Sequence, residues 1–98
     1  MAEALVRRVL AESQRPWMHD VQLAVVLDRM GRPEEAERLL EDDVARGLDV
    51  TEVWMALGLI LARQGKLEAA QDAYRHALAL DPRLEAARRR LDALTPAR

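Results

Sequence analysis

Residues 51–84, TEVWMALGLILARQGKLEAAQDAYRHALALDPRL, decide the fold of this chain. Alanine and leucine dominate the stretch and β-branched residues are few, a composition that favours helix. Gly65 ends a first helix, and Asp81-Pro82 ends a second helix that begins near Leu67. The stretch therefore predicts two helices joined by a short turn.

A set of apolar, small and aromatic residues stands at fixed spacings within this stretch. Its members are Trp54, Leu57, Gly58, Leu61, Ala70, Tyr74, Ala77 and Pro82. The set closely resembles the tetratricopeptide repeat, a 34-residue helix–turn–helix unit with the pattern W-x2-L-G-x2-Y, then A-x3-F, then P. Leu61 is the clear departure, because the family prefers tyrosine there. The resemblance implies an all-α scaffold that binds other proteins.

A second and more diverged copy lies 34 residues earlier. Leu57 falls on Leu23, Gly58 on Ala24, Leu61 on Leu27, Gly65 on Gly31, Ala70 on Ala36 and Tyr74 on Leu40. These positions keep their size and polarity, whereas Trp54 falls on Asp20. Residues 17–50 are therefore predicted to form a first repeat and residues 51–84 a second.

The flanking segments align with halves of repeats. Residues 2–13 align with a second helix and residues 83–94 with a first helix, and Pro96 and the residues after it are typical of a natural terminus. We expect one domain over residues 1–98, an all-α right-handed α-α superhelix of two repeats between a leading and a closing helix. Neither repeat can bury its faces alone, so its stability comes from stacking on neighbours.

Local signals place the helix ends and one helix crossing. Residues 49–52 are predicted to form a capping box, and Asp81-Pro82 to supply the cap and first turn of the closing helix. The two earlier helices, which begin near Pro16 and Pro33, are expected to end at Gly31 and Gly47. Gly58 is expected to face Ala70, where the absence of a side chain lets two backbones approach.

Composition excludes several classes of protein. The chain has no cysteine, which rules out disulfides and thiol chemistry, and its net charge of −2 argues against non-specific binding to nucleic acid or membrane. Residues 1–10 carry Glu3, Arg7 and Arg8 where a signal peptide needs an apolar run, so we expect a cytoplasmic protein. Of the 15 basic residues only Lys66 is lysine, a bias often seen in GC-rich bacteria.

No combination of residues predicts catalysis, a cofactor or a metal. His19 and His76 fall on different helices, and each is expected to be an ordinary exposed histidine. Ser13 has no base near it in the sequence. The acids of residues 41–43 point in different directions around one helical turn and are expected to form a solvated face. The sequence therefore predicts a protein that is not an enzyme.

The concave face lined by the first helix of each repeat is, in this family, the usual peptide-binding groove. Carried over position by position, the resemblance gives ten candidate groove residues: Met18, Val21, Gln22, Val25, Arg29, Met55, Leu59, Arg63, Arg89 and Arg90. Val21, Val25, Met55 and Leu59 would form an apolar stripe, and such stripes mark binding surfaces. The alternative is that these four side chains pack against the closing helix or a neighbouring repeat.

Two further features narrow the expected partner. A carboxylate clamp for acidic chaperone tails needs donors at five groove positions, which hold Val21, Val25, Ala56, Ala86 and Arg90. Four of the five lack a donor, so an apolar or amphipathic helix fits better. Residues 88–90, all arginine, are read as a solvated run or, with Arg29 and Arg63, as a basic rim. The charge and the 34-residue period argue against RNA binding.

The sequence thus predicts a non-enzymatic scaffold or adaptor that binds a peptide or amphipathic helix in its concave groove. One alternative is a self-assembly module that forms a weak homodimer through an uncovered end helix. Another is a regulatory segment of a larger protein complex.

Overall fold

A computed structural model of the chain describes residues 16–94. These residues form five helices: α2 (Pro16–Arg29), α3 (Pro33–Ala45), α4 (Thr51–Arg63), α5 (Leu67–Leu80) and α6 (Glu85–Leu94). No strand occurs within that range. The prediction of an all-α superhelix with two helix pairs and a closing helix is confirmed, while the predicted leading helix at residues 2–13 lies outside the described residues.

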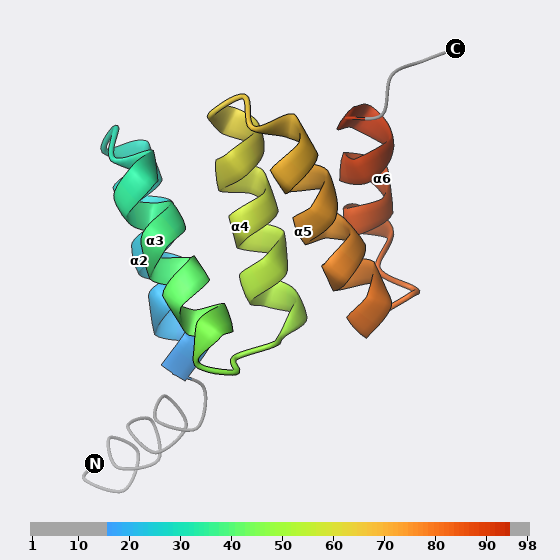
Figure 1. Cartoon of the computed structure of the whole chain (residues 1–98), viewed down its shortest axis with the longest axis horizontal. Helices are drawn as coiled ribbons and strands as arrows, with labels where there is room; N and C mark the ends of the chain where they lie inside the picture. The colour runs from blue at the N-terminus through green and yellow to red at the C-terminus, as the bar shows by residue number, and fades with distance from the viewer. Residues whose placement is uncertain (1–15, 95–98) are drawn as a thin grey trace, which may run out of the picture.

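Helices that follow one another along the chain pack side by side, as Figure 1 shows. α2 packs on α3 and α4 on α5, which gives the two repeats, and α3 packs on α4 to join them. α2 also contacts α4, so the first helices of the two repeats are neighbours. This arrangement places α2 and α4 together along one face of the stack.

The turns that follow α2, α3 and α4 share one backbone geometry. Gly31, Gly47 and Gly65 have φ values of 80°, 91° and 81°, a left-handed conformation that favours glycine. After α4, the Lys66 N–H donates to the Leu61 carbonyl at 3.0 Å, and the Gly65 N–H donates to Ala62 at 3.0 Å. The three predicted glycine ends are therefore confirmed.

The predicted capping box at residues 49–52 is wrong. α4 begins after Val50, which has an extended backbone and no capping side chain. Asp49 lies one residue too early to cap the first amides, and its carboxylate instead accepts a hydrogen bond from Nε1 of Trp54 at 2.6 Å. This bond ties the loop before α4 to the first turn of that helix.

The closing helix begins later than predicted. Asp81 and Pro82 do not supply its cap and first turn, because the chain first makes a turn in which the Leu84 N–H donates to the Asp81 carbonyl at 3.1 Å. The Asp81 side chain accepts from the Arg83 N–H at 3.2 Å, so it caps this turn. The helix starts at Glu85 as a result.

The core explains why position 58 is glycine. A Cβ atom built there would lie 2.6 Å from Cε1 and 2.8 Å from Cζ of Tyr74, whose ring is buried. Ala70, which the sequence predicts to face Gly58, is fully buried, and the group that requires glycine at this position is the Tyr74 ring. The first repeat has Ala24 and Leu40 at these two positions, both fully buried.

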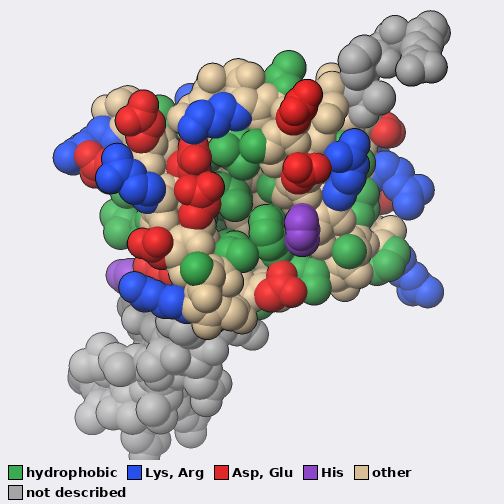
Figure 2. Space-filling model, viewed as in Figure 1, with side chains coloured by type: hydrophobic (Ala, Val, Ile, Leu, Met, Phe, Trp, Pro, Cys, Tyr) green, Lys and Arg blue, Asp and Glu red, His purple; other side chains and the backbone are tan. Residues whose placement is uncertain are grey.

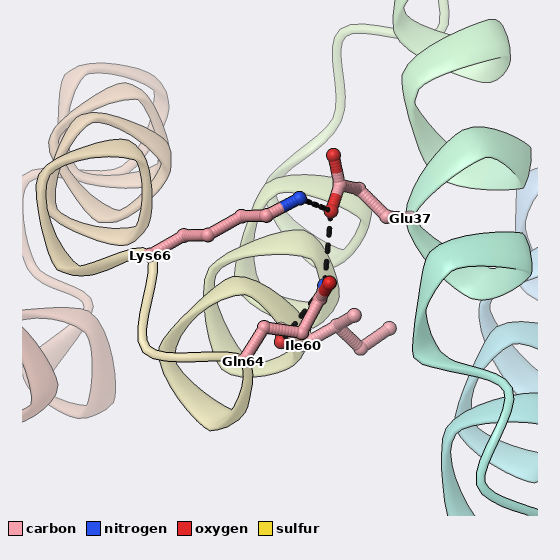
Figure 3. A network of polar contacts seen from close by, with 4 residues as sticks. All are labelled: Glu37, Ile60, Gln64 and Lys66. Atoms are coloured by element: carbon pink, nitrogen blue, oxygen red, sulfur yellow. Dashed lines mark hydrogen bonds and ion pairs between the residues drawn. The ribbon is translucent and has the colours of Figure 1, made fainter.

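A polar network holds the end of α4 against α3 (Figure 3). Oε1 of Glu37 accepts hydrogen bonds from Nε2 of Gln64 at 2.9 Å and from Nζ of Lys66 at 2.8 Å. Burial raises the pKa of Glu37, but the bonds from Lys66 and Gln64 outweigh it and leave that pKa below its usual value. One carboxylate therefore links the second repeat to the first.

Candidate binding groove

The candidate groove lies on α2 and α4, the neighbouring first helices of the two repeats. Val21 and Met55, which are 34 residues apart and so equivalent, are partly buried and pack against the core. Both side chains pack on the shared core, whereas the alternative raised by the sequence was packing against the closing helix or a neighbouring repeat. Val25 and Leu59, the next equivalent pair one turn further along, are also partly buried.

The other candidate residues on α2 vary in exposure. Met18 is partly buried, whereas Gln22 and Arg29 are exposed to solvent. Because helical positions three and four apart share a face, Met18, Val21, Gln22 and Val25 form one continuous stripe along α2. The stripe is therefore apolar with a polar edge.

Arg63 is held by an ion pair across the two helices. Its guanidinium lies 2.8 Å from the carboxylate of Asp28 on α2, and the Asp28 side chain is only 7% exposed. Because the Asp28 carboxylate has lost most of its hydration, it depends on the positive charge of Arg63 for compensation. Arg63, whose side chain is 54% exposed, therefore joins the two helices.

The arginines of α6 are exposed at the far side of the stack. Arg89 lies 3.5 Å from Glu85, and both side chains are about four-fifths exposed, so this pair adds little to stability. Arg90 lies close to Tyr74: burial raises the pKa of the Tyr74 hydroxyl, and the nearby guanidinium of Arg90 lowers it in part. α6 packs on α5, the second helix of the second repeat.

An aromatic stack that the sequence did not predict joins α4 to α5. The rings of Trp54 and His76 are 4.2 Å apart at their centroids and 14° from parallel. Nδ1 of His76 also lies 2.9 Å from the carbonyl oxygen of Asp72. His76 is exposed, as expected, but it covers one face of the indole. The first repeat has Asp20 and Asp42 at the equivalent positions, so this stack belongs to the second repeat.

A hydrophobic area is also visible on the face formed by α3, α4 and α5. Figure 2 shows hydrophobic side chains, in green, over α4, between the charged side chains that lie along α3 and α5. Sequence reasoning placed no site on this face. α2 lies behind α3 in this view, so the α2 part of the candidate groove is not displayed here.

One of the three clustered acids is not part of a solvated face. Glu41 and Asp42 are exposed as predicted, but Asp43 is 1% exposed. The correction follows from helix geometry, because Asp43 lies on the side of α3 that carries the buried residues Ala36 and Leu40. The described residues contain no group of three His, Cys, Asp or Glu that could hold a metal ion.

Pairs of packed helices that repeat with a 34-residue period define an α-helical repeat protein, a class that acts through its surfaces. The sequence profile of the tetratricopeptide repeat matches residues 21–85, and the chain belongs to that family. Tetratricopeptide repeats generally mediate protein–protein interactions.

Curated relatives carry the same repeat. The chain is 39% identical over 59 residues to human "Tetratricopeptide repeat protein 7A", a match that covers 60% of this chain and 7% of that protein. It is 40% identical over 60 residues to mouse "Tetratricopeptide repeat protein 7B", with 61% and 7% covered. The matched region is thus a small part of these relatives. None of the helices in residues 16–94 is long and apolar enough to cross a membrane.

Proposed function

We propose that the chain is a non-enzymatic adaptor that binds an amphipathic helix or apolar peptide of another protein across α2 and α4. The observation that carries the proposal is the pair Val25 and Leu59, which keep part of their surface exposed at equivalent positions on two helices in contact. Val21 and Met55, one turn earlier, pack on the core and would form the floor.

The charges near this pair favour an apolar ligand over an acidic one. Asp28 and Arg63 neutralise each other between the helices. The exposed Arg29 and the methionines Met18 and Met55 add a basic edge and adaptable contacts. An amphipathic helix with leucines or aromatics on one side and acids at its margin fits this pattern.

Replacing Val25 and Leu59 together with serine should weaken binding at least tenfold. Each buried side chain contributes roughly 1.5–3 kcal/mol of transfer free energy, of which only part remains after the cost of association. The measurement is the Kd of a helical peptide selected against the wild-type chain from a displayed library. Helical circular dichroism should be unchanged, because neither side chain is fully buried.

The matched control replaces two exposed leucines of α5, Leu67 and Leu80, with serine. This variant removes similar apolar surface away from the groove and should bind like wild type. A charge variant, Arg29→Gln with Arg89→Gln, should mainly slow association and flatten its salt dependence. Arg63 is left intact there, because its loss would leave Asp28 without its partner. Loss of binding in the charge variant with no effect of the serine pair would contradict the proposal.

Self-assembly is the second candidate, and an exposed stripe on α2 favours it. Leu23, Val26 and Met30 are 46%, 50% and 62% exposed, and their spacing places them on one side of the helix. Such a stripe is suited to a weak contact with a second copy. The predicted contribution of residues 2–13 to this contact lies outside the described residues.

If the stripe mediates association, light scattering should show an average mass that rises with concentration. Leu23→Glu with Val26→Glu should abolish that rise, because two charges would be buried in the contact. Substituting two exposed residues elsewhere, Ala69 and Ala79, with glutamate serves as the control. A constant monomer mass at millimolar concentration would exclude the self-assembly alternative.

A further inference from the structure

Two carboxyl groups occupy positions in the first repeat that are apolar in the second. Asp43 aligns with Ala77, which is fully buried, and Asp20 aligns with Trp54. Asp43 is itself 1% exposed and is the buried charged residue of the described core. The first repeat therefore places an acid where its sister repeat places a methyl group.

The surroundings of Asp43 do not suit an ionised carboxylate. Its Oδ2 atom is buried and has no hydrogen-bond partner among residues 16–94. The Asp20 carboxyl, on α2, is a neighbour of the Asp43 carboxyl. Two ionised carboxylates only accept hydrogen bonds, so they repel each other and leave Oδ2 unsatisfied. A single proton on the pair turns one carboxyl into a donor and satisfies the other.

The other charged groups that face Asp43 are on α3 and at Arg46, the residue that follows α3. Asp42 adds a second negative charge, and the guanidinium of Arg46 opposes it. Burial is the main cause that raises the pKa of Asp43 to about 6, followed by the hydrogen bond and charge of Asp20. Burial and Asp20 thus favour the protonated form of the Asp43 carboxyl, and in that form the buried carboxyl can donate a hydrogen bond.

We propose that Asp20 and Asp43 share one proton across the α2–α3 contact, and that loss of this proton selectively loosens the first repeat. The pair acts as a pH-sensitive element in one of two otherwise similar helix hairpins. Because a carboxyl that holds its proton more tightly in the folded state favours folding at low pH, the contribution is complete below about pH 4. It is lost as the pH rises through about 6.

The first experiment is a direct titration of the wild-type chain. Carbon-13 NMR of the side-chain carboxyl groups should show Asp43 titrating well above the usual range of an aspartate, with a pKa of about 6. Asp20→Asn should shift the Asp43 titration, because the two sites then no longer share a proton. A wild-type Asp43 that titrates below pH 4.5 would overturn the proposal, and this result does not depend on any variant folding.

The second experiment compares unfolding equilibria at pH 4.5 and pH 7. Asp43→Asn should gain stability relative to wild type as the pH rises. Its folded-to-unfolded ratio, divided by that of wild type at the same pH, should increase at least tenfold between pH 4.5 and pH 7. Asp43→Ala, which copies Ala77, should behave in the same way, and the control Asp42→Asn should not. Backbone amide exchange should assign the wild-type loss to α2 and α3. Parallel pH profiles for wild type and both Asp43 variants would refute the proposal.

Discussion

Replacing Gly58 with leucine should destabilise the chain by about 3 kcal/mol, at the upper end of the usual cost of overpacking. Even the first atom of the new side chain would lie 2.6 Å from the Tyr74 ring, which is 1% exposed and closely surrounded. In a domain of this size, such a loss lowers Tm by more than about 10 °C. Thermal unfolding followed by circular dichroism measures it.

A double-mutant cycle separates this clash from a general loss of helix packing. Gly58→Ala alone should destabilise the chain although alanine is the better helix former. Adding Tyr74→Leu should recover much of that loss, because the pair then copies Ala24 and Leu40 of the first repeat. The two changes should therefore couple by about 1 kcal/mol or more. Strict additivity would mean that the Tyr74 ring is not what Gly58 accommodates.

Replacing Ile60 with alanine should cost about 2–5 kcal/mol, the usual range for a buried large aliphatic residue. Ile60 is 1% exposed and lies one turn before Gln64, whose side chain bonds to Glu37 of α3. Figure 3 shows the Ile60 side chain directed toward that helix. The substitution therefore opens a cavity between the two repeats. Urea unfolding measures its cost.

Val26 provides the matched control, since it stands at the equivalent position of the first repeat. Val26 is 50% exposed, so Val26→Ala should lower the free energy of unfolding by about 0.5 kcal/mol or less. The difference in unfolding free energy between Ile60→Ala and Val26→Ala measures how much packing against a preceding helix, α3 in the case of Ile60, stabilises this position. A cost for Val26→Ala comparable to that for Ile60→Ala would show that another segment covers this face of α2 in solution.

The elements that the sequence predicted well are those with local causes. The ends of α2, α3 and α4 follow from Gly31, Gly47 and Gly65, whose backbone requirement acts within one turn and is visible in the residue itself. The repeat period likewise predicts which helices pair, because each 34-residue unit must bury its apolar faces on a neighbour. For the same reason the contact between α2 and α4, the first helices of the two repeats, could be expected.

The details that the sequence missed depend on contacts between helices. Nothing local to Asp49 distinguishes a cap for α4 from an acceptor for the Trp54 indole, since both roles use the same carboxylate. His76 stacks on Trp54 from the next helix, and Arg63 pairs with Asp28 from the previous repeat. Such partners are set by the rotation of one helix against another, which spacing along the chain does not specify.

Asp43 is a case in which a clue was present but was interpreted incorrectly. The three consecutive acids of residues 41–43 resemble a solvated face when read as a group. The repeat alignment, however, already places Asp43 on Ala77, an inward position. An acid at a position that the sister repeat fills with a small apolar residue is the signal of a buried charge.

The Gly58–Tyr74 and Ala24–Leu40 pairs have a consequence for how such arrays grow. Tandem repeats lengthen when duplication or recombination joins the front of one unit to the back of another. A hybrid with α2 in front of α5 would set the Ala24 methyl against the Tyr74 ring, which leaves no room for a Cβ at the equivalent site. The reciprocal hybrid would leave a void between Gly58 and Leu40. Viable exchange in this chain therefore has to keep each helix pair whole, with crossovers confined to the loops between repeats.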